Sequence, residues 1–422
     1  MKFDVWKYID ALEYCSKITD GTHDSPPSTT TGKPLITSKH IKGRNIDFES
    51  AYLISDNDYN KIIQRSKVDQ WDVIISMIGE YCGFCYVERN SEIDYAVKNV
   101  GLFKTGSKVK AEWLYYYLTS YQGRQVLSKI KTGSSQPYLT LGALRNLKIL
   151  VPVDEEITQK IVNVLSLIDA KIELNNKLTD NLEQMAKTLY DYWFVQFDFP
   201  DANGKPYKTS GGKMVWNDEL KREVPEGWSA STLDEIGNIT GGSTPSRDND
   251  SYFTKNGIAW ITPKDLSLNE GNKFIKRGEQ DVSQEGRNAA SLNTMPRGTV
   301  LMSSRAPVGY LAIARNEVTT NQGFKSFVPK SYFTTEFIYY TIKNLALVIE
   351  NNASGSTFKE VSTSVLKTIY FLAPQKQVIE MYTKSISSVF NRQELLEEEN
   401  QKLAELREWL LPMLMNGQVK IG

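Results

Sequence analysis

Two long stretches of the chain carry apolar residues at alternating spacings of three and four, the pattern of a helix with one apolar stripe. In the first stretch the stripe consists of Ile161, Leu165, Ile168, Ile172, Leu178, Leu182, Met185 and Leu189. In the second it consists of Ile379, Tyr382, Ile386, Val389, Gln393, Leu396, Leu403, Leu406, Leu410 and Met413. A pattern that lasts about five heptads is typical of a coiled coil, and the polar residues near its middle, Asn175, Gln393 and Asn400, are of the kind that fixes register. A lone amphipathic helix packed on a globular core would give the same stripe.

Shorter runs with other patterns separate the two helices. The runs WDVIISM (71–77) and GTVLMSS (298–304) are rich in β-branched residues and predict strands. The aromatic segments EWLYYYLTS (112–120) and EFIYYTIKN (336–344) predict short helices. Each globular part is therefore expected to be α+β.

The two halves of the chain match each other in the same order, at an offset of about 222–226 residues. The segment LITSK (35–39) recurs as AWITPK (259–264), and VIISMIGEYCG (73–83) as TVLMSSRAPVG (299–309). The two aromatic segments correspond, as do GSSQPYLTLGALRNLKILVP (133–152) and GSTFKEVSTSVLKTIYFLAP (355–374). Each copy ends in a long helix, so the chain is a duplication.

The duplication predicts a fold and its domain bounds. We expect an α+β chain of two duplicated, mixed α/β domains joined by two long helices, which pair as an antiparallel coiled coil related by a pseudo-two-fold axis. The expected bounds are 1–155 for the first domain, 156–197 for the first helix, 198–229 for a connector, 230–374 for the second domain and 375–422 for the second helix. A helix of about 35 residues rises roughly 50 Å, so such a pair would separate the domains as a spacer.

Charge is balanced overall but uneven along the chain. Fifty Lys and Arg residues offset fifty Asp and Glu residues among 422, so any nucleic-acid binding must use positive charge that is local or shared with a partner. Residues 101–150 hold eight basic residues against the single acid Glu112, and residues 297–367 hold eight against four. No run approaches eighteen apolar residues, so no membrane span is expected. Three cysteines and the lack of an export signal indicate the cytoplasm.

Motifs for catalysis or cofactor binding are absent from the sequence. Cys82 and Cys85 form a CxxC, but the second copy has Val308 and Leu311 at the matching positions, so packing is the favoured interpretation. There is no phosphate-binding G-x-x-x-x-G-K loop, no G-x-G-x-x-G and no H-E-x-x-H. We therefore predict no catalytic residue, no metal site and no cofactor in this chain.

If the chain binds nucleic acid, polar loops and nearby basic residues are the candidates for the contacts, because phosphate positioning uses Lys, Arg and hydroxyl groups and base readout uses Arg, Lys, Asn and Gln. The same pattern would also fit a solvated face. The candidates in the first copy are Thr22, His23, Lys39, Lys42, Arg44, Ser134, Ser135, Gln136 and Tyr138. Those in the second copy are Ser243, Thr244, Arg247, Lys264, Arg305, Lys325, Ser356, Thr357 and Lys359. Several of these Ser and Thr side chains could cap helices or close turns instead, and for His40 a turn is the favoured interpretation.

Six segments spread over the chain resemble one known family. They are ITDGTHDSP (18–26), LGALRNLKILVPVDEEITQKIVNVLSLIDAKIELNN (141–176), LYDYWFVQFDFP (189–200), GKPYKTSGGKMVWNDELKREVPEGW (204–228), TGGSTPSR (240–247) and LREWLLPMLMNGQV (406–419). With them, essentially the whole chain resembles the specificity (S) subunits of type I restriction–modification enzymes. The segment APQKQVIEMYTKSISSVF (373–390) departs from the family pattern, since it lacks the Pro-Glu-x-x-x-Ile run, and this puts the start of the second helix in doubt.

The resemblance implies a non-catalytic DNA-recognition subunit. Each target-recognition domain would read one half of a bipartite double-stranded DNA site, and the helices would set the spacing and dock two methylation (M) subunits. Restriction (R) subunits would join through the complex, and the chemistry would lie in the partner subunits. Two other functions remain open from the residues: a coiled-coil structural adaptor, and a recognition module of a fused DNA methyltransferase.

Overall fold

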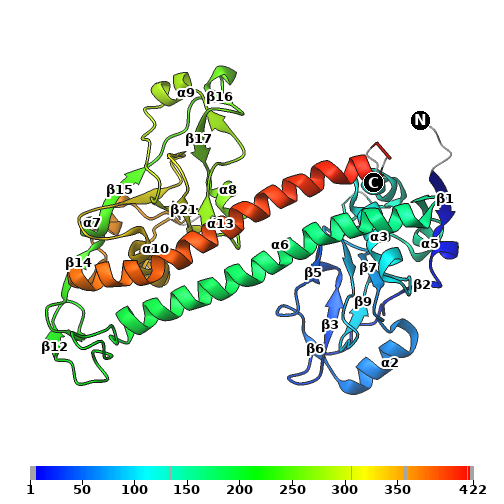
Figure 1. The fold of residues 1–422 in the computed structure, drawn as a ribbon, viewed down its shortest axis with the longest axis horizontal. Helices are drawn as coiled ribbons and strands as arrows, with labels where there is room; N and C mark the ends of the chain where they lie inside the picture. Colours follow the sequence, from blue (N-terminus) through cyan, green and yellow to red (C-terminus); the bar gives the residue numbers. More distant parts are fainter. Residues whose placement is uncertain (1–5, 134, 306, 356–358, 416, 419–422) are drawn as a thin grey trace. The chain divides into compact units, whose positions relative to one another are not determined.

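The structure is a computed structural model that describes residues 6–133, 135–305, 307–355, 359–415 and 417–418. The chain divides into two compact units. The first unit comprises residues 1–172 and 402–422, and the second comprises residues 173–401. Each unit contains one globular domain and a segment of both long helices, which are drawn in green and in orange to red in Figure 1.

The two long helices are continuous. Helix α6 spans Glu155–Tyr190, 36 residues, and continues into a π-helical turn at Asp191–Val195. Helix α13 spans Lys376–Met415, 40 residues, with Pro412 near its end. The prediction of a long helix after each copy is therefore confirmed. Among the described residues, no helix combines the length and apolar character that a membrane span requires.

Within each unit the helix segments pack antiparallel. In the second unit, Asn175 of α6 donates a hydrogen bond to Asn400 of α13 at 2.9 Å. Glu183, about two turns further along α6, accepts a hydrogen bond from Gln393 at 3.3 Å. In the first unit, Asp169 accepts a hydrogen bond from Arg407 at 2.8 Å. Contacts on α13 thus run backwards as α6 advances, as the predicted antiparallel pairing requires.

The predicted apolar stripe is right in one part and wrong in another. Ile161, Leu165 and Ile168 are buried, but Leu178 and Met185 are 37% and 59% exposed. The buried positions in this part of α6 are instead Asn175, Thr179, Ala186 and Tyr190. On α13, Leu406 is also exposed. Hydrophobicity alone misplaces this part of the packed face because the polar residues Asn175 and Thr179 occupy positions in it.

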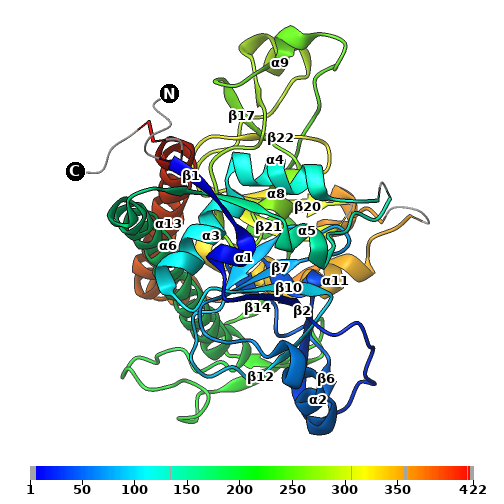
Figure 2. The same cartoon turned by 90° about the vertical axis from the view of Figure 1, so that its right-hand side faces the viewer.

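The first domain is built around a four-stranded sheet in the order β2-β10-β7-β8, in which all neighbours are antiparallel. A second, three-stranded sheet has the order β6-β3-β9. Figure 2 shows the strands β7, β10 and β2 of this domain. The elements are β1 Trp6–Asp10, α1 Ala11–Tyr14, β2 Lys17–Asp20, β3 Lys33–Thr37, β4 Ile41–Lys42, β5 Asn45–Ile46, β6 Leu53–Ile54, α2 Asp56–Ser66, β7 Asp72–Ser76, β8 Cys85–Val87, β9 Ala96–Lys98, β10 Val100–Lys104, α3 Lys108–Thr119, α4 Tyr121–Ile130, α5 Leu141–Arg145 and β11 Lys148–Pro152.

The second domain repeats this plan. Its main sheet has the order β15-β23-β20-β21-β18, and β17 and β22 pair in parallel as β3 and β9 do in the first domain. A connector hairpin, β12–β13, precedes it. The elements are β12 Met214–Asn217, β13 Arg222–Pro225, β14 Ser229–Thr232, α7 Leu233–Ile236, β15 Gly237–Gly241, β16 Phe253–Thr254, β17 Ile258–Ile261, α8 Pro263–Leu268, β18 Phe274–Ile275, β19 Asp281–Val282, α9 Gln284–Ala289, β20 Val300–Ser304, β21 Val308–Ala314, β22 Thr319–Thr320, β23 Lys325–Pro329, α10 Thr335–Asn344, α11 Ala346–Asn351, α12 Thr363–Leu366 and β24 Tyr370–Ala373.

Each domain closes on itself through its first and last strands. In the first domain β1 pairs antiparallel with β11, and Trp6 lies opposite Pro152. In the second, β14 pairs with β24, and Ser229 lies opposite Ala373. A long helix then begins within three residues of the closing strand in both cases. The sheet order, the closing pair and the helix positions together confirm the predicted duplication and α+β fold.

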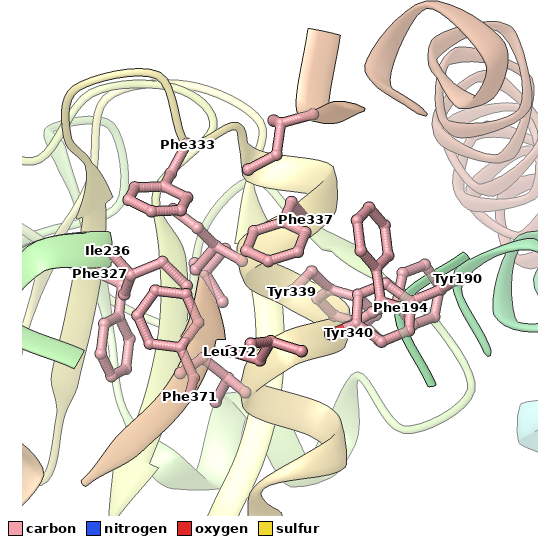
Figure 3. Packing of buried hydrophobic residues seen from close by; sticks show 14 of the residues in the cluster. Tyr190, Phe194, Ile236, Phe327, Phe333, Phe337, Tyr339, Tyr340, Phe371 and Leu372 are labelled. Carbon is pink, nitrogen blue, oxygen red and sulfur yellow. The ribbon is translucent and has the colours of Figure 1, made fainter. Parts of the chain in front are cut away.

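Each domain shares one hydrophobic core with its helix segments. In the first unit, Ile161 and Leu165 of α6 belong to the same buried cluster as Trp113 of α3 and Leu414 of α13. In the second unit, the rings of Tyr190 and Phe194 meet those of Phe337 and Tyr340 (Figure 3), with centroids 4.9 Å apart for Phe194 and Phe337. Burial of these rings removes a large apolar area from water and so stabilises the attachment of each domain to the helices.

Candidate nucleic-acid interface

The predicted loops of each copy meet at one end of its main sheet. Strand β10 runs antiparallel to both β2 and β7, so the loops that leave β2 and β7 lie at the end where β10 begins. The same holds for β15, β20 and β23 in the second domain. We call these the first and second loop ends. The duplication therefore presents the same set of loops twice.

The loop after β2 is shaped by Thr22 and exposes His23. The Thr22 amide donates to the Val97 carbonyl at 3.0 Å, and its hydroxyl accepts from the Asp24 amide at 3.1 Å. Thr22 is buried and therefore forms the turn. His23 has a side chain that is 62% exposed, and its ring lies 2.9 Å from an Asp20 carboxylate oxygen. The imidazole is held in place and remains accessible.

His40 and Lys39 occupy one short helical turn after β3. The Thr37 amide donates to His40 Nδ1 at 2.9 Å, which closes a capping box. His40 is fully buried, and this burial lowers the pKa of its imidazole. The interpretation of His40 as a turn residue is confirmed. Lys39, next to it, is exposed.

A hairpin at residues 132–138 places further candidates on the first loop end. Thr132 and Tyr138 exchange backbone hydrogen bonds of 2.9 and 2.8 Å. The Gly79 amide donates to the Pro137 carbonyl at 2.9 Å, which ties the hairpin to the loop after β7. Ser135 and Gln136 are exposed at its tip, and Tyr138 is 40% exposed. Ser134 lies outside the described residues.

The loop after β7, residues 78–84, adds two aromatic side chains that the sequence did not single out. Tyr81 and Phe84 pack edge to face with ring centroids 5.6 Å apart, and Phe84 is 46% exposed. The ammonium group of Lys42 lies 4.1 Å from the centre of the Tyr81 ring. The signal that could have found them is the placement of two aromatic residues around Gly83, whose φ of 94° requires glycine. The equivalent Gly309 has a φ of 99°.

Cys82 and Cys85 in this region are packing residues. Both thiols are buried and unbonded to each other. Burial raises the pKa of Cys85 to about 12, so the thiol stays protonated and unreactive near neutral pH. The favoured interpretation of the CxxC is confirmed.

Arg44 contacts residues of α3 and α6. Its guanidinium group lies 2.8 Å from Asp169 of α6 and 3.5 Å from Glu112 of α3. Burial on its own lowers the pKa of Arg44, but Asp169 and the neighbouring Tyr116 and Glu112 outweigh it and raise the pKa. We therefore leave Arg44 out of the proposed DNA surface, since its charge is already neutralised.

The loop after β15 has the same design in the second domain. The Ser243 amide donates to the Thr320 carbonyl at 3.0 Å, and the Trp260 indole donates to the Ser243 carbonyl at 3.1 Å. The Thr244 hydroxyl donates to the Gln322 side chain. Both residues are half-buried and shape the loop. Arg247 further along is exposed, with its guanidinium carbon 5.7 Å from the centre of the Phe253 ring.

Basic residues gather around Glu360 at the second loop end. Arg305, directly after β20, forms an antiparallel β-bridge with Glu360 through the backbone. The ammonium group of Lys325 lies 3.8 Å from the Glu360 carboxylate. Lys359 is exposed beside them. Lys264, in the first turn of α8, is exposed and pairs with Glu279 at 2.7 Å. Ser356 and Thr357 lie outside the described residues.

The two hairpins attach to their sheets in the same way. In the first domain the Leu139 amide donates to the Met77 carbonyl at 2.8 Å, and in the second the Val361 amide donates to the Ser304 carbonyl at 3.0 Å. Tyr138 and Glu360 are the residues that close the two hairpins. The backbone frame is shared, and the side chains that it presents differ.

Comparison with known proteins places this duplicated α/β architecture in a class of DNA-specificity proteins. Residues 29–184 and 225–405 both match the sequence model of the type I restriction modification DNA specificity domain. These two matches cover most of the chain, which therefore belongs to this family.

Curated relatives are specificity subunits of type I restriction enzymes. The MjaIX subunit of Methanocaldococcus jannaschii is 36% identical over 198 residues, which is 44% of this chain and 45% of that protein, less than half of its length. The HindI subunit of Haemophilus influenzae is 26% identical over 421 residues, with 87% of this chain and 83% of that protein covered. These relatives confirm the prediction of a DNA-specificity subunit rather than an enzyme.

A solved structure supports the fold. The crystal structure of a type I restriction–modification S subunit from M. genitalium superposes with a TM-score of 0.63 at 14% identity, covering 98% of this chain and 97% of that one. At this identity the likeness concerns the fold alone.

Proposed function

We propose that this chain selects the DNA sequence in a type I restriction–modification complex and that each domain reads one half of a bipartite double-stranded site. The observation that carries the proposal is the repetition of the loop end: one backbone frame, present twice, bears different polar, basic and aromatic side chains. Two copies of one reader with different side chains suit an asymmetric site in two parts.

The proposed contacts at the first loop end are His23, Lys39, Lys42, Ser135, Gln136 and Tyr138, with Tyr81 and Phe84 added. At the second loop end they are Arg247, Lys264, Arg305, Lys325 and Lys359. Arginine, lysine and glutamine offer the hydrogen bonds that distinguish base edges, and exposed lysines neutralise phosphates. Thr22, Ser243 and Thr244 would act by holding the loops in shape.

We further propose that the long helices set the spacing between half-sites and dock two methylation subunits. Leu174, Leu178 and Met185 are exposed on α6 although they are apolar. A groove beside Met185 in the second unit is lined by α6 and by Ser385, Ile386 and Val389 of α13. Exposed apolar stripes of this kind mark sites of protein association. Restriction subunits would join through the assembled complex, and methylation and cleavage would occur in the partner subunits.

The proposed domain bounds follow the duplication: 1–155 and 230–374 for the two recognition domains, 156–197 and 375–422 for the helices, and 198–229 for the connector. The helix elements begin at Glu155 and Lys376.

Sequencing of N6-methyladenine in cells that express the chain with a cognate methylation subunit tests the proposed function. We expect a split motif that appears only when this chain is present. If the complex assembles and no new methylation appears, the proposal fails, and a purely structural adaptor becomes the better description.

A further inference from the structure

A buried carboxylate on α6 joins three parts of the first unit. Asp169 is 3% exposed. One of its oxygens accepts from Arg407 of α13 at 2.8 Å. The other accepts from Arg44 of the first domain at 2.8 Å and from the Tyr116 hydroxyl of α3 at 2.7 Å. We call this set of four residues the Asp169 junction.

Both buried carboxylates around this junction are paired with guanidinium groups inside the unit. Glu112 of α3 is almost fully buried and accepts from Arg89 at 2.8 and 3.0 Å and from Arg44 at 3.5 Å. Two buried carboxylates therefore face three guanidinium groups, and both acceptor oxygens of Asp169 are used. A set of charges this complete forms in only one arrangement of the domain on its helices, because any other leaves a buried charge without a partner.

A second junction of the same kind lies in the second unit. Glu183 of α6 accepts from Lys273 at 2.6 Å, from the Tyr340 hydroxyl at 2.9 Å and from Lys343 at 2.8 Å. Lys273, which is 4% exposed, also donates to Gln393 of α13 at 2.7 Å. Tyr340 and Tyr116 are matching residues of the aligned segments 336–344 and 112–120, so both copies use the same tyrosine to reach a carboxylate of α6.

Apolar packing alone would hold each domain on its helices less specifically. Hydrophobic contact stabilises burial without a preferred direction, and similar apolar surfaces can slide by small amounts at little cost. Charge-assisted hydrogen bonds require defined distances and angles. The two junctions thus add hydrogen bonds of defined direction to domain–helix interfaces that are otherwise mostly apolar.

We propose that Asp169 and Glu183 are positioning residues that fix the orientation of each recognition domain on the helix pair and so restrict the spacer length that the subunit accepts between half-sites. This inference rests on the proposed function, since it assumes that each domain reads a half-site. Neither residue is on a loop end, so the bases read would stay the same.

The test uses the full chain in complex with its methylation subunits and a DNA pool in which the two half-sites are separated by the native spacer or by one or two base pairs more or fewer. For Asp169→Asn and Glu183→Gln we expect the preference for the native spacer over its neighbours to fall by about tenfold, as loss of one charge-assisted hydrogen bond implies. The half-site sequences in the methylated products should be unchanged.

Two matched variants serve as controls. Glu156→Gln on α6 and Glu380→Gln on α13 remove an exposed carboxylate that pairs with a lysine one turn away, at 3.3 and 3.6 Å. Both should keep the native spacer preference. Tyr116→Phe provides a milder change at the junction if Asp169→Asn does not fold, because it removes a single hydroxyl group.

The outcomes separate positioning from stability. A junction variant that lowers methylation equally at every spacer would show a merely structural role and overturn the inference. Unchanged spacer preference in Asp169→Asn, Glu183→Gln and Tyr116→Phe would also overturn it. If the wild-type complex itself methylates no split motif, the proposed function fails and the inference falls with it, a result distinct from a split motif whose spacing ignores the junctions.

A spectroscopic measurement gives an independent readout. Spin labels at Lys39→Cys and at Leu167→Cys, which replaces a side chain that is 70% exposed on α6, would report the distance between the first domain and its own segment of α6. The native thiols are buried, so labelling should favour the introduced sites. We expect Asp169→Asn to broaden the distance distribution and Glu156→Gln to leave it unchanged; equal widths would contradict the positioning role.

Discussion

The two recognition domains share a backbone frame and differ in the side chains placed on it. Both order their main sheet in the same way, both begin and end on a paired strand, and both dock a hairpin through one amide onto the end of the central strand. At the first loop end this hairpin is bonded to Gly79, in the loop that carries Tyr81 and Phe84, whereas at the second Glu360 bridges Arg305 and lies 3.8 Å from Lys325. The shared frame therefore fixes the positions of the loop-end side chains, which we propose to contact bases, and leaves their identities free.

The attachments to the helices differ in the same manner. Tyr116 and Tyr340 occupy matching positions, but the first meets an aspartate paired with two arginines and the second a glutamate paired with two lysines. In both copies the matching tyrosine donates a hydrogen bond to a carboxylate of α6, but the carboxylate and the basic residues paired with it differ.

The largest expected effect comes from lengthening both helices together. Seven residues inserted between Lys177 and Leu178 and seven more between Glu398 and Glu399 would extend the helix pair by about 10 Å. This corresponds to roughly three base pairs of DNA, so the methylated motif should keep both half-sites and gain about that many spacer positions. Methylome sequencing measures this directly.

Insertion into α6 alone is the control for that experiment. It would shift one helix against the other by about two turns. The contacts of Asn175 with Asn400, before the insertion, and of Glu183 with Gln393, after it, could not both persist, so loss of assembly is expected. A doubly lengthened chain that retained the native spacer would show that the helices do not set the distance.

A smaller effect is expected from substitutions at the two loop ends, each of which should weaken recognition of a different half-site. Arg305→Ala should weaken discrimination at one half-site by about tenfold or more, and Gln136→Ala should do so at the other, since a base contact contributes roughly 1–3 kcal/mol. Binding measured against a panel of single-base changes in each half-site would show the split. Arg392→Ala on α13 removes an exposed arginine outside both loop ends and should alter neither half-site. If either loop-end variant weakened both half-sites equally, the assignment of one domain to one half-site would be wrong.

The smallest effect is a difference in acid stability between the units. Burial on its own raises the pKa of Glu183, but Lys273 and Lys343 outweigh it and lower the pKa to about 2. Because an unfolded glutamate titrates near 4.3, this carboxylate stabilises the second unit above that pH. We expect the stabilisation to decrease by about 2 kcal/mol between about pH 5 and pH 3.

The first unit should respond in the opposite direction through Asp72. Burial raises the pKa of Asp72 to about 6, so the folded unit binds a proton more readily than the unfolded chain and gains stability as the pH falls from about 6 to about 4. Fragment-resolved pulse proteolysis in urea across this range should show the second unit unfolding first in acid. Glu183→Gln should flatten the acid dependence of the second unit, and an unchanged slope would count against the assigned cause.

The sequence predicted the parts of this molecule that depend on local pattern. The β-branched run at 298–304 is β20, the aromatic segments are α3 and α10, and the repeated order of segments established the duplication. The family followed from long segments of unusual composition such as 204–228. Each of these signals lies within one stretch of chain.

The remaining features depend on contacts between distant residues. Leu178 and Met185 fit the apolar stripe by spacing, but Asn175 and Thr179 occupy the packed face. Arg44 resembled a phosphate contact until its partner Asp169, 125 positions away in the chain, became visible in the structure. Tyr81 and Phe84 belong to the first loop end because their loop is bonded to the hairpin at 132–138, which is distant in sequence. Neither the periodicity nor the composition of the sequence predicts contacts between residues that are so far apart in the chain.

The pairing of the first and last strands has a consequence for how such a protein can evolve. Trp6 and Pro152 lie opposite each other, as do Ser229 and Ala373, so the chain enters and leaves each domain at neighbouring points. A gene segment that encodes everything between two such points can be replaced by recombination as one block, with the flanking helices left intact. Under the proposed function, one crossover at each boundary would exchange the half-site that the domain reads and leave the rest of the subunit unchanged.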